Sequence, residues 1–135
     1  MSERIIISFR VGTSPENLPS AVQRVIDLLD SLSCRPAIEA PLLRLVVDEA
    51  LTNAMEHGNR WERSKYVYID IDSGDSAVSV SIEDEGEGFD SRSACIRTCG
   101  FPTAPRGRGM HLISALCDAK WARRGNRVCL RFPVG

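Results

Sequence analysis

The sequence has no long apolar run and almost no net charge, and each absence excludes a class of function. No stretch approaches the roughly 20 consecutive apolar residues that span a membrane, and the apolar run after Arg4 is too short for a signal peptide. We therefore expect a soluble protein without a membrane partner. The net charge is −1, whereas non-specific nucleic-acid binding needs a strong positive field, so we expect no direct nucleic-acid partner.

The five cysteines do not have the spacing of a metal or redox motif. No pair is separated by the two residues that zinc and thioredoxin-like motifs require, and the number is odd. Cys95 and Cys99 lie four residues apart, and we assign them no role. Incidental thiols are typical of a reducing compartment, so we expect the protein to be cytoplasmic.

The remaining composition is that of one globular domain, which we expect to span residues 1–135. Hydrophobic residues make up 43% and charged residues 26% of the chain, enough for a core. Alternation of apolar and polar residues predicts strands that have one buried face, and a hairpin around Gly74. Helical spacing follows Ser14-Pro15-Glu16 and recurs in the middle of the chain. The predicted strands are residues 4–11, 65–72, 77–83, 120–123 and 127–132.

The most informative stretch is residues 44–59, which we predict to form one amphipathic helix with Pro41 in its first turn. Gly58 is expected to end it in the left-handed conformation, and Thr52 and Met55 are expected on the side away from the core. The expected core-facing residues are Leu43, Val46, Val47, Ala50 and Ala54.

Glu49 and Asn53 lie one turn apart at the edge of this apolar stripe. A carboxylate there can accept a proton or orient an attacking oxygen, and an amide oxygen can hold a hard cation such as Mg²⁺. The alternative is that both are polar border residues of an ordinary packing helix.

Two glycine motifs follow. Asp84-x-Gly86-x-Gly88 comes directly after a predicted strand, where glycines let the backbone approach a flat ligand and Asp84 can accept a hydrogen bond from an amino group. Gly107-x-Gly109 leads into a predicted helix, whose N–H groups favour phosphate. Taken singly, the first could be a turn and the second a loop end. Neither a P-loop nor an EF-hand motif is present.

In this order the three motifs resemble those of the histidine-kinase-like ATPase (GHKL) superfamily. Residues 48–54 with His57-Gly58 resemble its N box, residues 84–89 its first glycine box, and residues 107–110 with Leu112-Ile113 its second. Within the superfamily the chain is most similar to stand-alone anti-sigma factor serine/threonine kinases.

The resemblance implies a two-layer α/β sandwich that has a mixed, mostly antiparallel sheet with helices on one face. It also implies ATP and Mg²⁺ as cofactors, beneath a lid formed by residues 90–106. Glu49 would be the general base, Asn53 the Mg²⁺ ligand and Asp84 the adenine contact. The remaining nucleotide-binding residues implied are His57, Gly86, Gly88, Phe89, Arg106, Gly107, Arg108, Gly109 and Met110.

The resemblance further implies an anti-anti-sigma protein as the substrate, a sigma factor as a second partner, and a homodimer. We expect the dimer to form through the helix-free face of the sheet, where Tyr66 and Tyr68 are exposed. Two alternatives stay open. One is a regulatory module that binds nucleotide and sequesters a partner without phosphoryl transfer. The other is the catalytic domain of a two-component histidine kinase, although neither His57 nor His111 is placed like a phospho-acceptor.

Overall fold

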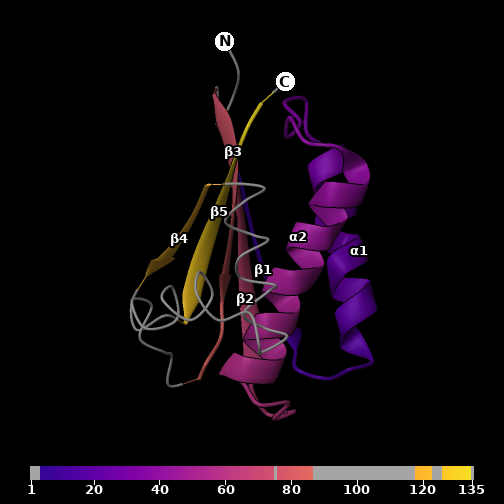
Figure 1. Ribbon diagram of the computed structural model, residues 1–135, viewed down its shortest axis with the longest axis vertical. Coiled ribbons are helices and arrows are strands. Elements are labelled where there is room, and N and C mark those ends of the chain that lie inside the picture. The colour runs from indigo at the N-terminus through magenta and orange to yellow at the C-terminus, as the bar shows by residue number, and fades with distance from the viewer. Residues whose placement is uncertain (1–3, 75, 87–117, 123–125, 135) are drawn as a thin grey trace, which may run out of the picture.

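In the part of the chain that the structure describes, one five-stranded sheet carries two α-helices on one of its faces (Figure 1). The computed structural model describes residues 4–74, 76–86, 118–122 and 126–134. This two-layer α/β arrangement agrees with the expected fold class. The elements are β1 (Ile5–Gly12), α1 (Asn17–Asp30), α2 (Ala40–Thr52), η1 (Asn53–Gly58), β2 (Tyr66–Ser73), β3 (Ala77–Glu83), β4 (Asp118–Ala122) and β5 (Arg127–Pro133).

The strands lie in the order β1-β2-β3-β5-β4, and all four pairings between the described strands are antiparallel. The register places apolar side chains opposite one another. Ile69 of β2 lies between Phe9 of β1 and Ile82 of β3. Since alternate side chains point to opposite faces, the period-two pattern gives the sheet one apolar face. The β2–β3 hairpin around Gly74 is as predicted.

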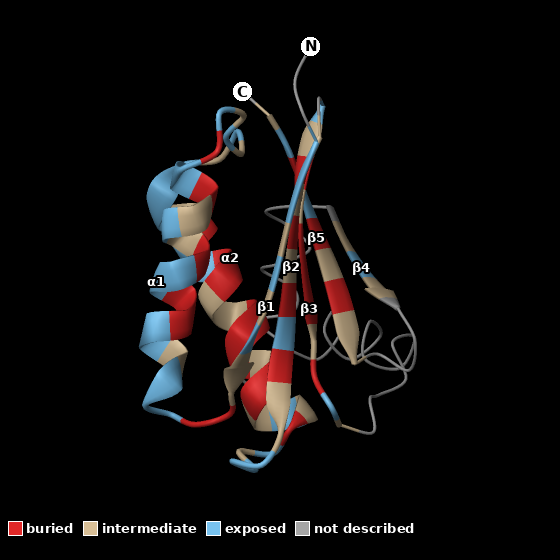
Figure 2. Ribbon diagram, turned by 180° about the vertical axis from the view of Figure 1, so that it is seen from behind, coloured by how far each residue is buried: buried red, intermediate tan, exposed pale blue. Residues whose placement is uncertain are grey.

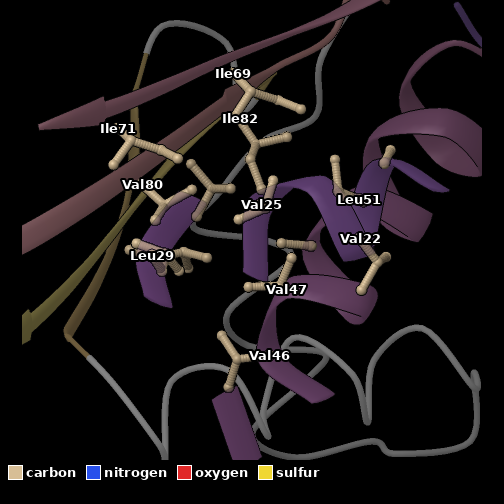
Figure 3. Close-up of a cluster of buried hydrophobic side chains, with 14 of the residues drawn as sticks. Val22, Val25, Leu29, Val46, Val47, Leu51, Ile69, Ile71, Val80 and Ile82 are labelled. Carbon is tan, nitrogen blue, oxygen red and sulfur yellow. The ribbon is translucent and has the colours of Figure 1, made fainter. Parts of the chain in front are cut away.

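Both helices pack against that apolar face, and their buried sides turn toward the strands (Figure 2). Burying a large aliphatic side chain contributes about 1.5–3 kcal/mol, so this layer holds the two helices on the sheet. Pro41 lies in the first turn of α2, as predicted. Figure 3 shows part of the core, in which the labelled residues are Val22, Val25 and Leu29 from α1, Val46, Val47 and Leu51 from α2, and Ile69, Ile71, Val80 and Ile82 from the sheet.

The central helix changes its geometry at Asn53. Up to Thr52 it is an α-helix, and from Asn53 to Gly58 it continues as a π-helix. The N–H of Asn59 donates to the carbonyl of Ala54, five residues back, at 2.8 Å. Such π-turns are rare in proteins, and those that occur are often found at functional sites.

Two details of the predicted helix are wrong. Thr52 and Met55 are buried, 8% and 0% exposed, and do not face away from the core. Because α2 packs against α1 as well as the sheet, its buried arc is wider than one stripe. The π-turn also contains more residues than an α-turn, which rotates Met55 inward.

Gly58 is not in the left-handed conformation either. The chain instead reverses at Arg60 and Trp61, whose φ angles are 52° and 57°. Glycine is therefore required at position 58 not for its φ angle but because a Cβ there would overlap the carboxyl group of Asp84. None of the described helices is long and apolar enough to cross a membrane.

Candidate functional site

Two predicted site residues, Asp84 and Gly86, meet Gly58 at the end of η1. The backbone of Gly58 lies so close to Asp84 that a Cβ on Gly58 would be 2.1 Å from Asp84 Cγ. A Cβ on Gly86 would be 2.1 Å from the Gly58 carbonyl oxygen. Only glycine fits at both positions, because real Cβ atoms do not approach other atoms this closely. The last turn of the N-box helix is thus in direct contact with the segment that follows β3.

The Asp84 carboxyl is buried at this contact, with 8% of the residue exposed. Its Oδ1 accepts a hydrogen bond of 2.8 Å from the N–H of Gly86. Burial, together with the neighbouring charge of Glu83, raises the pKa of Asp84 to about 6, although the Gly86 hydrogen bond and Lys65 oppose the rise. Raised acid pKa values in clefts are typical of functional groups.

Asn126, in the turn before β5, holds the backbone of Asp84. The N–H of Asp84 donates to the Asn126 carbonyl at 2.9 Å, and the Asn126 side-chain Nδ2 donates to the carbonyl of Asp84 at 3.2 Å. The first of these bonds extends the β3–β5 ladder beyond Glu83. The carboxyl of Asp84 therefore projects from a residue whose backbone N–H and carbonyl are both bound.

Asn59 is a site residue that the sequence did not reveal. Its side chain is completely buried, and its Oδ1 accepts a hydrogen bond of 2.8 Å from the N–H of Glu85. Asn126 was missed for the same reason. In both cases an amide bonds to a distant peptide group, and peptide groups occur at every position, so no residue pattern points to the pairing.

Glu49 and Asn53 are brought together as predicted, on the last turn of α2 and the first residue of η1. Both are half-buried. The Asn53 Oδ1 is buried and accepts no hydrogen bond from any residue that the structure describes. A π-helix joins residues five apart, so Asn53 lies one turn before Gly58 and its contact with Asp84.

The buried Asn53 oxygen fits the role of a Mg²⁺ ligand. A buried acceptor without a donor is costly, and a neutral amide oxygen is an ordinary ligand for a hard cation. The described residues contain no cluster of three or more His, Cys, Asp or Glu side chains that could hold a metal. Mg²⁺ bound there would therefore take most of its ligands from phosphates and water, which is typical of this ion.

His57 lies on η1 with its side chain half-exposed, and its Nε2 is 3.5 Å from a carboxylate oxygen of Glu56. The other predicted residues lie outside the described ranges. They are Gly88, Phe89, the expected lid 90–106 with Cys95 and Cys99, and Arg106, Gly107, Arg108, Gly109 and Met110.

The comparison with protein families agrees with this geometry. The family model of the histidine kinase-like ATPase domain matches residues 12–132. The chain belongs to this family. A comparison with the curated proteins found no match. The matched span contains every site residue predicted from the sequence, from Glu49 to Met110. Membership of this family implies ATP as a ligand.

Proposed function

We propose that this ATPase domain is an ATP-dependent protein serine/threonine kinase of the anti-sigma type, whose substrate is an anti-anti-sigma protein. The observation that carries the proposal is the pairing of Glu49 with the buried, unpartnered oxygen of Asn53, one helical turn apart. A domain that only sequesters a partner has no use for a carboxylate beside the metal ligand.

Each residue of the proposed site has one task. Asp84 accepts the hydrogen bond of the adenine amino group, and Asn53 holds Mg²⁺. When bound, Mg²⁺ neutralises negative charge on the phosphates. Glu49 orients the serine or threonine hydroxyl and takes its proton as the oxygen bonds to the γ-phosphorus and ADP leaves. Phosphoryl transfer needs little else from a protein beyond positioning and charge.

The second glycine box would complete the phosphate end of the site. Gly107 and Gly109 precede a predicted helix, and Arg106 and Arg108 would add positive charge to the transferring phosphoryl group. The finer assignment to anti-sigma kinases rests on the resemblance of nearly the whole 135-residue chain, and of its size, to the kinase domains of that group. It carries with it a sigma factor as a second partner, bound without phosphorylation.

The proposal is tested by phosphoryl transfer to a partner. Proteins that co-purify with the chain are identified by mass spectrometry, purified, and incubated with it, Mg²⁺ and γ-labelled ATP. The expected result is label on a serine or threonine of the partner, dependent on Mg²⁺ and greatly reduced with Asp84→Asn. A partner that binds in the presence of ATP and stays unlabelled contradicts the kinase and favours the sequestering module. Label on a histidine contradicts the serine/threonine assignment.

A further inference from the structure

The buried amide of Asn59 links three segments of the chain that are distant in sequence. Its Nδ2 donates to Thr13 Oγ1 at 2.8 Å and to the carbonyl of Tyr66 at 3.0 Å. Its Oδ1 accepts from the N–H of Glu85 at 2.8 Å. The residue is 0% exposed, so both amide hydrogens and the oxygen are used inside the protein.

The partners of Asn59 are themselves fixed. The N–H and the hydroxyl of Thr13 both donate to the carbonyl of Lys65, at 3.1 and 2.8 Å. A carboxylate oxygen of Glu85 accepts from the N–H of Tyr66 at 2.5 Å. Tyr66, the first residue of β2, is therefore bound at its carbonyl by Asn59 and at its N–H by Glu85. Asn59 at the centre of these bonds is buried, whereas Glu85 is exposed. A buried amide whose bonds are all satisfied holds its partners rigidly.

This network ends at the peptide beside the proposed base-binding carboxyl. Glu85 stands between Asp84 and Gly86, and the N–H of Gly86 holds Oδ1 of Asp84. Fixing the N–H of Glu85 therefore fixes the turn that orients the carboxyl. The second oxygen, Oδ2, makes no hydrogen bond to any described residue and is the atom left for a ligand.

We propose that Asn59 is a positioning residue for recognition of the purine base: it holds the 84–86 turn so that Oδ2 of Asp84 meets an exocyclic amino group. The inference rests on the proposed function, because it requires that Asp84 binds the base of ATP. Asn59 itself does not contact the nucleotide. Its effect is on the discrimination between bases and not on the affinity for phosphate.

The test compares ATP with inosine triphosphate, which has a carbonyl in place of the 6-amino group. Calorimetry gives both dissociation constants for the wild type, for Asn59→Ala and for Asn17→Ala. The wild type is expected to prefer ATP. Asn59→Ala is expected to reduce the preference about tenfold, the effect of misplacing one buried hydrogen-bond acceptor. Asn17→Ala removes an exposed amide bond to the Gly12 carbonyl and is expected to keep the preference.

The preference between the two nucleotides separates positioning from stability. A merely structural role would lower the melting temperature of Asn59→Ala and leave the ratio of dissociation constants unchanged, and that result overturns the inference. Faster hydrogen exchange of the Glu85 amide in Asn59→Ala is also expected. If Asn59→Ala does not fold, Thr13→Val decides, since it removes one of the acceptors of Asn59 and is remote from Asp84. It is expected to reduce the preference about threefold, and an unchanged ratio overturns the inference.

The failure of the inference is distinguishable from the failure of the proposed function. A wild type that binds neither nucleotide overturns both. A wild type that binds the two equally overturns base recognition through Asp84, and with it the role of Asn59, while ATP binding and phosphoryl transfer stand. A wild type that prefers ATP, with the same preference in both folded variants, overturns only the role of Asn59.

Discussion

Gly58 lies against the carboxyl group of Asp84 so closely that any side chain at position 58 would overlap it. A Cβ there would be 2.1 Å from Asp84 Cγ and 2.2 Å from Oδ2. The segment that resembles the N box, which contains Gly58, is thus in direct packing contact with the segment that resembles the first glycine box, which contains Asp84. Displacing Asp84 from it would change both the packing of η1 on the sheet and the position of the acceptor proposed to bind adenine.

Gly58→Ala is therefore expected to reduce both stability and nucleotide binding. The added methyl group must displace a buried carboxyl or the backbone of η1, and overpacking of this kind costs about 1–3 kcal/mol or more. Thermal unfolding measures the first effect, and calorimetric titration with ATP measures the second.

Gly74→Ala is the matched control for this substitution. A Cβ on Gly74 would be 3.5 Å from the Ala77 carbonyl oxygen, which is ordinary van der Waals contact. This variant is expected to keep the wild-type stability and affinity. Equal melting temperatures for the two alanine variants would contradict the close contact between Gly58 and Asp84.

Asp84→Asn is expected to stabilise the protein at pH 8 while it weakens ATP binding. Because the folded-state pKa of Asp84 is raised from 3.8 to about 6, its stabilising contribution is present below pH ~4 and is lost as the pH rises through about 6. Two pKa units correspond to about 3 kcal/mol, which is the upper limit of the gain. The asparagine loses the charged acceptor, so the affinity for ATP falls by about tenfold or more.

The measurement is chemical unfolding of both proteins between pH 4 and pH 8. The carboxyls of Glu16 and Asp72, whose pKa values are lowered by Arg63 and Arg4, are the same in both proteins. The difference between the two stability curves therefore isolates Asp84. A difference that does not grow between pH 4 and pH 7 would show that the carboxyl is not buried as described.

Most of the fold could be predicted because it depends on periodicity. The alternation of Val67, Ile69 and Ile71 identified β2 and its buried face, and Leu43 with Val46 identified the packing side of α2. The π-turn could not be predicted, because a rare backbone geometry has no residue pattern. Because of this π-turn, two predictions about the helix are wrong. Met55 is buried and does not face away from the core, and Gly58 does not end the helix in the left-handed conformation.

The candidate site, too, could be predicted from the sequence only in part. Glu49, Asn53 and Asp84 could be proposed from the sequence because charged or amide side chains stand at positions where an ordinary helix or turn would not need them. The sequence could not show that Gly58 is in contact with Asp84, since two backbone segments meet there through the absence of side chains. Nor could it reveal Asn59, whose partners are a hydroxyl and two peptide groups in other segments.

We predict that the chain forms a homodimer through the face of its sheet on which the structure describes no helix. Tyr68 is 39% exposed on that face and lies beside Tyr66, with ring centroids 6.5 Å apart and ring planes tilted by 50°. Tyrosine is enriched in interfaces. Tyr68→Glu is expected to give a monomer in light scattering. Leu45→Glu is the matched control, because Leu45 is 37% exposed on α2, in the other layer. A wild type that is monomeric at high micromolar concentration contradicts the prediction.

The roles of Glu49 and Asn53 are separated by comparing Glu49→Gln with Asn53→Ala. Glutamine keeps the size of Glu49 and can still form hydrogen bonds, but it cannot accept a proton from the incoming hydroxyl. Glu49→Gln is therefore expected to bind ATP with Mg²⁺ nearly as the wild type does and to transfer phosphate ~10²–10⁴ times more slowly. Asn53→Ala removes the buried oxygen proposed to hold Mg²⁺, so it should lose the Mg²⁺-dependent part of binding together with transfer.

Titrations with ATP, with and without Mg²⁺, give two affinities for each protein, and single-turnover experiments give its transfer rate. The Mg²⁺-free affinity is the internal control, because neither substitution touches the contact of Gly58 with Asp84. Transfer by Glu49→Gln at the wild-type rate would show that Glu49 is not the base. An unchanged effect of Mg²⁺ on the affinity of Asn53→Ala would remove Asn53 as the ligand, and its buried oxygen would then have to be satisfied by water.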